Sequence, residues 1–167
     1  MRFYLVLGIL ILVSFVLQLL WVQYLPIFGI GPQILLVVII YFALNYGPII
    51  GEIYGFISGL FLDIFSISVF GTQCFIFTII GYINGIMSNR VDEKNIRVQC
   101  ILSLLETYFQ IGIVYLFSKI FLSDSIISYK DIIIAPIYTS VLAPGIFRIM
   151  DLIILRIKKW FGKTNQI

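Results

Sequence analysis

The stretch "GPIIGEIYGFISGLFLDIFS", residues 47–66, places a small or acidic residue at every fourth position of an otherwise apolar segment. The row consists of Gly47, Gly51, Gly55, Gly59 and Asp63. Residues four apart lie on one ridge of an α-helix, so a helix over 48–65 would carry a smooth strip that ends in a carboxylate. Glycines in such a strip let two helix backbones approach closely, which is how helices associate in lipid. We therefore predict that this row packs against another helix, either of this chain or of a partner.

The composition around this stretch is that of an integral membrane protein. The chain has 167 residues, of which 61% are hydrophobic and 11% are charged, and its mean hydropathy is +1.11. Soluble domains are about half apolar and about a quarter charged, and they could not bury so much apolar surface. The net charge of +3 comes from scattered basic residues rather than from a basic cluster. We therefore expect no nucleic-acid partner.

The residue types that carry chemistry are scarce. The chain has no histidine, which removes the commonest general base and the commonest transition-metal ligand. Cys74 and Cys100 lie inside apolar runs and are interpreted as buried free thiols. The sequence contains no nucleophile–base pair, phosphate-binding loop or metal motif. We expect a protein that is not an enzyme and that holds no cofactor and no metal.

Apolar runs divide the chain into candidate membrane spans, since a span needs roughly 20 apolar residues. We expect one transmembrane domain over residues 1–167, an all-α bundle of about six helices. The expected spans are 3–21, 34–46, 48–65, 70–88, 98–118 and 132–155, followed by a basic tail at 156–167. The second and third runs could instead form a re-entrant pair. The first run has no small-x-small cleavage site after it and is interpreted as a retained span.

The distribution of basic residues predicts the orientation, because cytoplasmic segments carry more lysine and arginine. Eight such residues fall in the segments that share the N-terminal side: Arg2, Arg90, Lys94, Arg97, Arg156, Lys158, Lys159 and Lys163. The other side holds Lys119 and Lys130. We expect a multi-pass protein of the bacterial cytoplasmic membrane with both termini in the cytoplasm. Trp160 and Phe161 in the tail suit an anchor at anionic lipid headgroups, and a solvated tail is the alternative.

Two acids in the glycine-rich run are candidate functional residues. Glu52 lies eleven residues before Asp63, which is about three helical turns, so both carboxylates should share one helix face. A carboxylate that faces lipid costs about 3 kcal/mol or more. We therefore expect Glu52 and Asp63 to point into a packed interface or a wet cavity.

A second polar stripe lies in the fifth run. Gln99, Ser103, Glu106 and Gln110 follow one another at steps of four, three and four residues, which places them on one helix face. Glu106 and Gln110 fall inside the apolar segment. The stripe is either a hydrogen-bond seam between helices or a ligand or proton site. In the sixth run, Arg148 and Asp151 are three residues apart and could pair.

The segment 31–71 combines a proline, an apolar run, a Gly-Pro turn and a glycine-rich run that ends in an acid. The residues of this pattern are Pro32, Gly47, Pro48, Gly51, Gly55, Phe56, Gly59, Leu60, Asp63 and Gly71. The pattern resembles the signature region of the rod-shape-determining MreD family, which has a Pro-Asp start, an apolar run, a Gly-Pro turn, and then G-x-x-x-G-F-x-x-G-L-x-x-D with a glycine shortly after. One departure is Gln33, where the family has an acid.

The resemblance implies a non-catalytic scaffold subunit of the machinery for cell-wall elongation, which links the cytoskeleton to peptidoglycan synthesis. The implied partners are MreC, the actin-like MreB, the RodA glycosyltransferase and a class B penicillin-binding protein. In this interpretation the glycine row or the polar stripe docks MreC. The alternative is a substrate-binding membrane subunit of an energy-coupling-factor vitamin transporter, whose fold is thought to be similar. Those subunits bring small residues to their first helix for docking, whereas the first span here has a lone Gly8.

Overall fold

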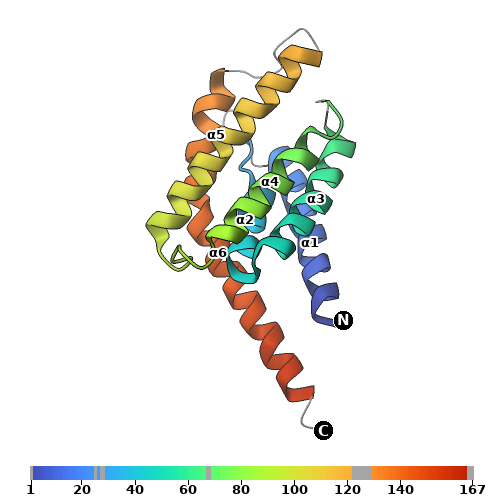
Figure 1. Ribbon diagram of the computed structural model, residues 1–167, viewed down its shortest axis with the longest axis vertical. Helices are drawn as coiled ribbons and strands as arrows, with labels where there is room; N and C mark the ends of the chain where they lie inside the picture. Colours follow the sequence, from blue (N-terminus) through green and yellow to red (C-terminus); the bar gives the residue numbers. More distant parts are fainter. Residues whose placement is uncertain (1, 25, 27–28, 67–68, 122–128, 165–167) are drawn as a thin grey trace.

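The computed structural model is an all-α bundle (Figure 1). It describes residues 2–24, 26, 29–66, 69–121 and 129–164, and the side chains at 2–7, 129, 158 and 160–164 lie outside the description. The described ranges form six helices. They are α1 Arg2–Tyr24, α2 Ile34–Tyr46, α3 Pro48–Phe65, α4 Thr72–Met87, α5 Ile96–Phe121 and α6 Tyr129–Thr164.

The helices fall into two groups. The first four cluster together, while α5 and α6 lie side by side as a second unit, and the C-terminal part of α6 extends beyond the bundle (Figure 1). The start of α1 and the end of α6 point toward the same end of the molecule (Figure 1). Within the described ranges, three helices are long and apolar enough to cross a membrane: Pro48–Phe65, Ile96–Phe121 and Lys130–Ile157. The other apolar helices are shorter, at Gly8–Tyr24, Ile34–Tyr46 and Thr72–Met87.

Helix α2 forms the centre of the fold. Each residue from Ile34 to Leu44 is buried, and α2 packs against all five other helices. Its sequence, "ILLVVIIYFALNY", is apolar on every face until Asn45, which is typical of a helix enclosed on all sides. At 13 residues it is only about 20 Å long, shorter than the hydrocarbon core of a bilayer. Since protein surrounds it, α2 needs no lipid-facing surface.

Side chains from other helices satisfy the first backbone N–H groups of α2. The Leu35 N–H donates to Gln18 Oε1 of α1 at 2.8 Å, and the Gln33 N–H donates to Thr139 Oγ1 of α6 at 3.1 Å. The first N–H groups of a helix have no partner within the helix, and an apolar surrounding offers no water to replace one. These contacts therefore fix the depth of α2 against α1 and α6.

The remaining helices pack as neighbours along the chain. Helices α3 and α4 form a closely packed hairpin, which has the most extensive contact in the molecule among the described residues, and α5 packs mainly on α6. The contact between α4 and α5 is much smaller. Helix α4 therefore has an extensive contact with α3 and a small one with α5, and the candidate residues lie at both contacts.

Candidate functional site

The glycine row of α3 lies directly against the backbone of α4. A Cβ atom added at Gly51 would overlap the carbonyl oxygen of Gly81, and one added at Gly55 would overlap the carbonyl of Phe77. At Gly59 the added atom would overlap the backbone of the first turn of α4. The relation is reciprocal, because a Cβ at Gly81 would overlap the Gly51 carbonyl. The absence of side chains at these positions is what allows the two backbones to touch.

This contact corrects one expectation about the row. A partner's span cannot dock in the strip formed by Gly51, Gly55 and Gly59, because α4 of the same chain already occupies it. Gly47 has a different task, since a Cβ there would meet nothing and its φ of 89° is one that other residues rarely adopt. It forms the turn between α2 and α3.

Asp63, at the end of the row, caps α4 from the neighbouring helix. Its side chain is 3% exposed. Oδ1 accepts the backbone N–H of Gln73 at 3.0 Å, and Oδ2 accepts that of Cys74 at 2.9 Å. These are two of the first N–H groups of α4, which no residue within α4 can satisfy. A carboxylate at a helix N-terminus also interacts favourably with the helix dipole.

Glu52 and Phe56 are exposed on α3. They belong to a stripe of exposed residues that we name the outer α3 stripe: Ile49, Glu52, Ile53, Phe56, Leu60 and Ile64. Both acids were expected to point into a packed interface or a wet cavity. Among the described residues Asp63 is buried in such an interface, whereas Glu52 is exposed. Asp63 faces α4, whereas the side chain of Glu52 is exposed.

The polar stripe of α5 faces α4 and forms two hydrogen bonds with it. Asn84 Nδ2 donates to Glu106 Oε1, and Gln110 Nε2 donates to Gln73 Oε1 at 3.0 Å. Three buried oxygens in this layer have no hydrogen-bond partner among the described residues: Asn84 Oδ1, Glu106 Oε2 and Gln110 Oε1. All three are acceptors, so the layer between α4 and α5 holds more acceptors than donors.

The rest of the α5 stripe is also covered within the chain. Ser103 and Thr107 are fully buried, and each donates to a carbonyl of α5 one turn earlier. Ser140 Oγ of α6 donates to the Cys100 carbonyl at 2.9 Å and ties α6 to α5. The stripe therefore joins α5 to its neighbours and does not offer a free docking face.

Asp151 pairs with a residue that the sequence pattern did not indicate. Tyr41 of the central helix donates its hydroxyl to Asp151 Oδ1 at 2.7 Å. The structure shows no ion pair between Arg148 and Asp151, both of which it describes, so the pairing expected from their spacing is wrong. Trp160 and Phe161, expected to anchor the tail at lipid headgroups, lie where the structure describes no side chains.

Several polar residues that position the helices were missed by sequence reasoning. Gln18, Asn84 and Thr139 each make a contact between helices from inside an apolar run. An isolated polar residue in such a run is itself a signal, because it needs a partner away from lipid. Among the described residues, no group of three or more His, Cys, Asp or Glu side chains could hold a metal ion.

We name the contact of Gly51, Gly55 and Gly59 with the backbone of α4 the glycine seam. The apolar helices, the glycine seam and the buried polar contacts between helices define an α-helical integral membrane protein. The model of the family described as rod shape-determining protein MreD matches residues 1–153, and the chain belongs to the MreD family. No curated protein and no solved structure matches the chain. The family resemblance first seen over 31–71 is thus confirmed and extends over most of the chain, and it supports a role in determining rod shape.

Proposed function

We propose that this chain is a non-catalytic scaffold subunit of the cell-wall elongation complex in the bacterial cytoplasmic membrane. In this proposal it binds MreC and, with it, connects the actin-like MreB to RodA and to a class B penicillin-binding protein. The membership in the MreD family and the apolar helices support this assignment. The basic residues near the end of α6 then lie at the cytoplasmic surface, where the tail meets anionic lipid.

The surface that binds MreC in this proposal is the outer α3 stripe. The family motif divides between two faces of α3: its glycines and Asp63 face α4, whereas Phe56 faces outward, with 51% of its surface exposed. Both faces that the sequence suggested for docking are filled by helices of the same chain. The motif residues that remain available to a partner are therefore on the outer stripe.

Glu52 is the single observation that carries this choice. It lies four residues before Phe56 on the exposed face of a helix that is long and apolar enough to span the membrane. An acid on a lipid-facing surface costs about 3 kcal/mol or more, unless it reaches the headgroups or a partner supplies a donor. The single span of MreC, packed along the apolar residues of the stripe, would provide such a donor and remove Glu52 from lipid.

Co-purification from membranes tests the proposal. Glu52→Ala, Phe56→Ala and the double variant should lose most of the MreC that the unaltered chain retains, because they remove the acid and the largest side chain of the stripe. Ile101→Ala and Leu105→Ala are matched controls, since both residues are exposed on α5. Retention of MreC by the double variant, with the partners identified by mass, would refute the outer α3 stripe as the docking surface.

A further inference from the structure

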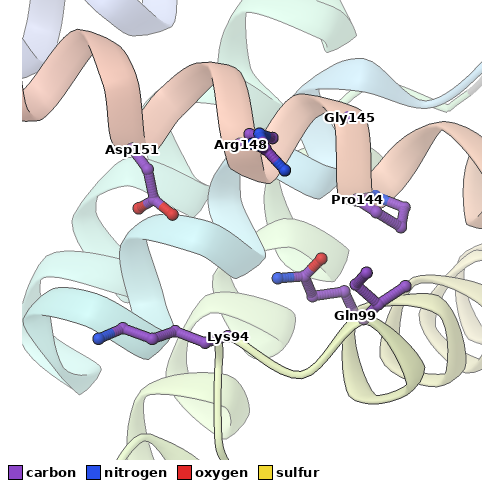
Figure 2. A pocket seen from close by; sticks show the side chains of 7 residues that line it. Lys94, Gln99, Pro144, Gly145, Arg148 and Asp151 are labelled. Carbon is purple, nitrogen blue, oxygen red and sulfur yellow. The ribbon is translucent and has the colours of Figure 1, made fainter.

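A pocket of about 470 Å³ opens between the start of α5 and the middle of α6 (Figure 2). Its lining combines basic, acidic, amide and apolar groups from two distant parts of the chain. The lining residues are Lys94, Ile96, Gln99, Pro144, Gly145, Arg148 and Asp151. Figure 2 shows Gln99 of α5 opposite Arg148 and Pro144 of α6, with Lys94 just before α5 begins. The glycine seam, the Asp63 cap and the outer α3 stripe all lie elsewhere.

The two cations of the pocket have no anionic partner in the part of the chain that the structure describes. The structure shows no ion pair for the side chain of Lys94 or for that of Arg148. Asp151, the acid of the pocket, instead accepts the hydroxyl of Tyr41 at 2.7 Å. The lining holds two basic side chains and one acidic side chain, which is a formal net charge of +1. That balance suits a ligand group with a single negative charge better than a multiply charged anion.

The pocket lies at a boundary between polar and apolar surface. The polar segment 88–95 ends at Lys94 and Asn95, and α5 begins with Ile96, which is 62% exposed. On α6, Ile149 and Leu152 flank Arg148 and are also largely exposed. A ligand with a charged head and apolar chains could therefore place its head in the pocket and its chains along these residues.

We propose that this pocket binds the phosphodiester headgroup of a membrane phospholipid. Arg148 supplies a planar pair of N–H donors that matches two phosphate oxygens, and Lys94 adds a second positive charge from the α5 side. A phosphodiester carries one negative charge, which the net charge of the lining balances. The acyl chains lie on Ile96, Ile149 and Leu152. A bound headgroup would bridge α5 and α6 at this end of the bundle.

Gly145 provides a way to fill the pocket without disturbing the fold. Beyond its chain neighbours and the adjacent backbone of its own helix, a Cβ atom added at Gly145 would meet no atom within 4 Å, and the same is true of Gly112 on α5, which does not line the pocket. A leucine at either position should be accommodated, because neither glycine has a neighbour that it would displace and leucine favours a helix more than glycine does. Gly145→Leu therefore occupies the headgroup site, and Gly112→Leu is its matched control.

The test measures thermal unfolding of the purified full chain in detergent with three added probes. These are phosphatidylglycerol, diacylglycerol with the same acyl chains, and inorganic phosphate. Phosphatidylglycerol should raise the unfolding midpoint of the unaltered chain and of Gly112→Leu, because a ligand that binds the folded state stabilises it. Diacylglycerol should not raise it. Gly145→Leu and Arg148→Gln should lose at least half of the lipid-induced shift.

The remaining outcomes would overturn the proposal. A full shift with Gly145→Leu would place the lipid elsewhere, for example on Arg156 and Lys159 further along α6. An equal shift with diacylglycerol would show that the acyl chains alone act. An equal shift with inorganic phosphate would identify a free anion, rather than a lipid, as the occupant. Arg148→Gln changes an exposed side chain, so its result stands even if Gly145→Leu fails to fold.

Discussion

The carboxylate of Asp63 on α3 accepts the backbone N–H of Cys74 on α4 at 2.9 Å, and its second oxygen accepts the N–H of Gln73. The family motif therefore ends in a side chain that completes the N-terminus of the next helix. The glycines before it bring the two backbones into contact, and the acid fixes the position of one helix along the other. Together they make the hairpin of α3 and α4 a single closely packed unit.

Replacing Asp63 should weaken this hairpin in a graded way. Asparagine offers one acceptor oxygen for two N–H donors and turns its own NH₂ group toward one of them, whereas leucine offers no acceptor. Each hydrogen bond to a charged group contributes about 1.5–3 kcal/mol. The midpoint of thermal unfolding of the purified chain should be highest for the unaltered protein, lower for Asp63→Asn and lowest for Asp63→Leu. The control is the same pair of substitutions at the exposed Glu52, which should change the unfolding midpoint little. If Asp63→Leu were as stable as the unaltered chain, Asp63 would not cap α4.

A glycine-to-alanine substitution should have opposite effects on stability at Gly55, in the glycine seam, and at Gly112, outside it. Gly55→Ala places a methyl group against the Phe77 carbonyl, so the helices must separate, at a cost of about 1–3 kcal/mol. Gly112→Ala meets no neighbour and should stabilise α5 by up to about 1 kcal/mol through helix propensity. The measurement is the unfolding midpoint of each variant in the same detergent. Equal midpoints for the two variants would show that α3 and α4 are not in backbone contact.

Glu106 should tolerate an amide better than an apolar side chain. Glutamine keeps an acceptor for Asn84 Nδ2 and supplies an N–H where the buried Glu106 Oε2 has no partner. Leucine removes the acceptor and leaves a buried donor of Asn84 unsatisfied, which costs about 1–3 kcal/mol. Glu106→Gln should therefore unfold near the unaltered midpoint and Glu106→Leu well below it. The account of this layer fails if leucine is the better replacement.

The seams show what could and could not be predicted from the sequence. Glycines that recur at every fourth position predict a close contact with another helix, because helix geometry alone puts those positions on one ridge. Which helix fills the ridge depends on tertiary packing, and Gly81 and Gly85 of α4 were not recognised as the complementary row. Periodicity likewise placed Glu106 and Gln110 on one face, whereas their partners, Asn84 and Gln73, come from a helix more than 20 residues earlier.

Glu52 shows the limit of the periodicity argument most clearly. Its spacing from Asp63 predicts a shared face, yet the structure buries one acid and exposes the other. Gly51 packs against the backbone of Gly81 on α4, yet the side chain of Glu52, the next residue, is exposed. A small angular difference at the edge of a helix contact thus decides burial, and a helical wheel does not resolve it.

Labelling in intact cells tests the orientation with both termini in the cytoplasm. In a chain with Cys74→Ala and Cys100→Ala, a cysteine at Ser125 should react with a membrane-impermeant thiol reagent, and one at Asn89 should react only after the cells are broken. The reason is the excess of basic residues on the side that includes segment 88–95. The reverse pattern would place the termini outside.

Photo-crosslinking from the outer α3 stripe tests the central claim most directly. A photoreactive amino acid replaces Phe56 in growing cells, and a second strain carries it at Leu105, an equally exposed position on α5. Adducts are isolated after illumination and identified by mass. The account predicts an adduct with MreC from position 56 and little or none from position 105. Adducts with lipid alone at position 56, or with MreC only from position 105, would contradict it.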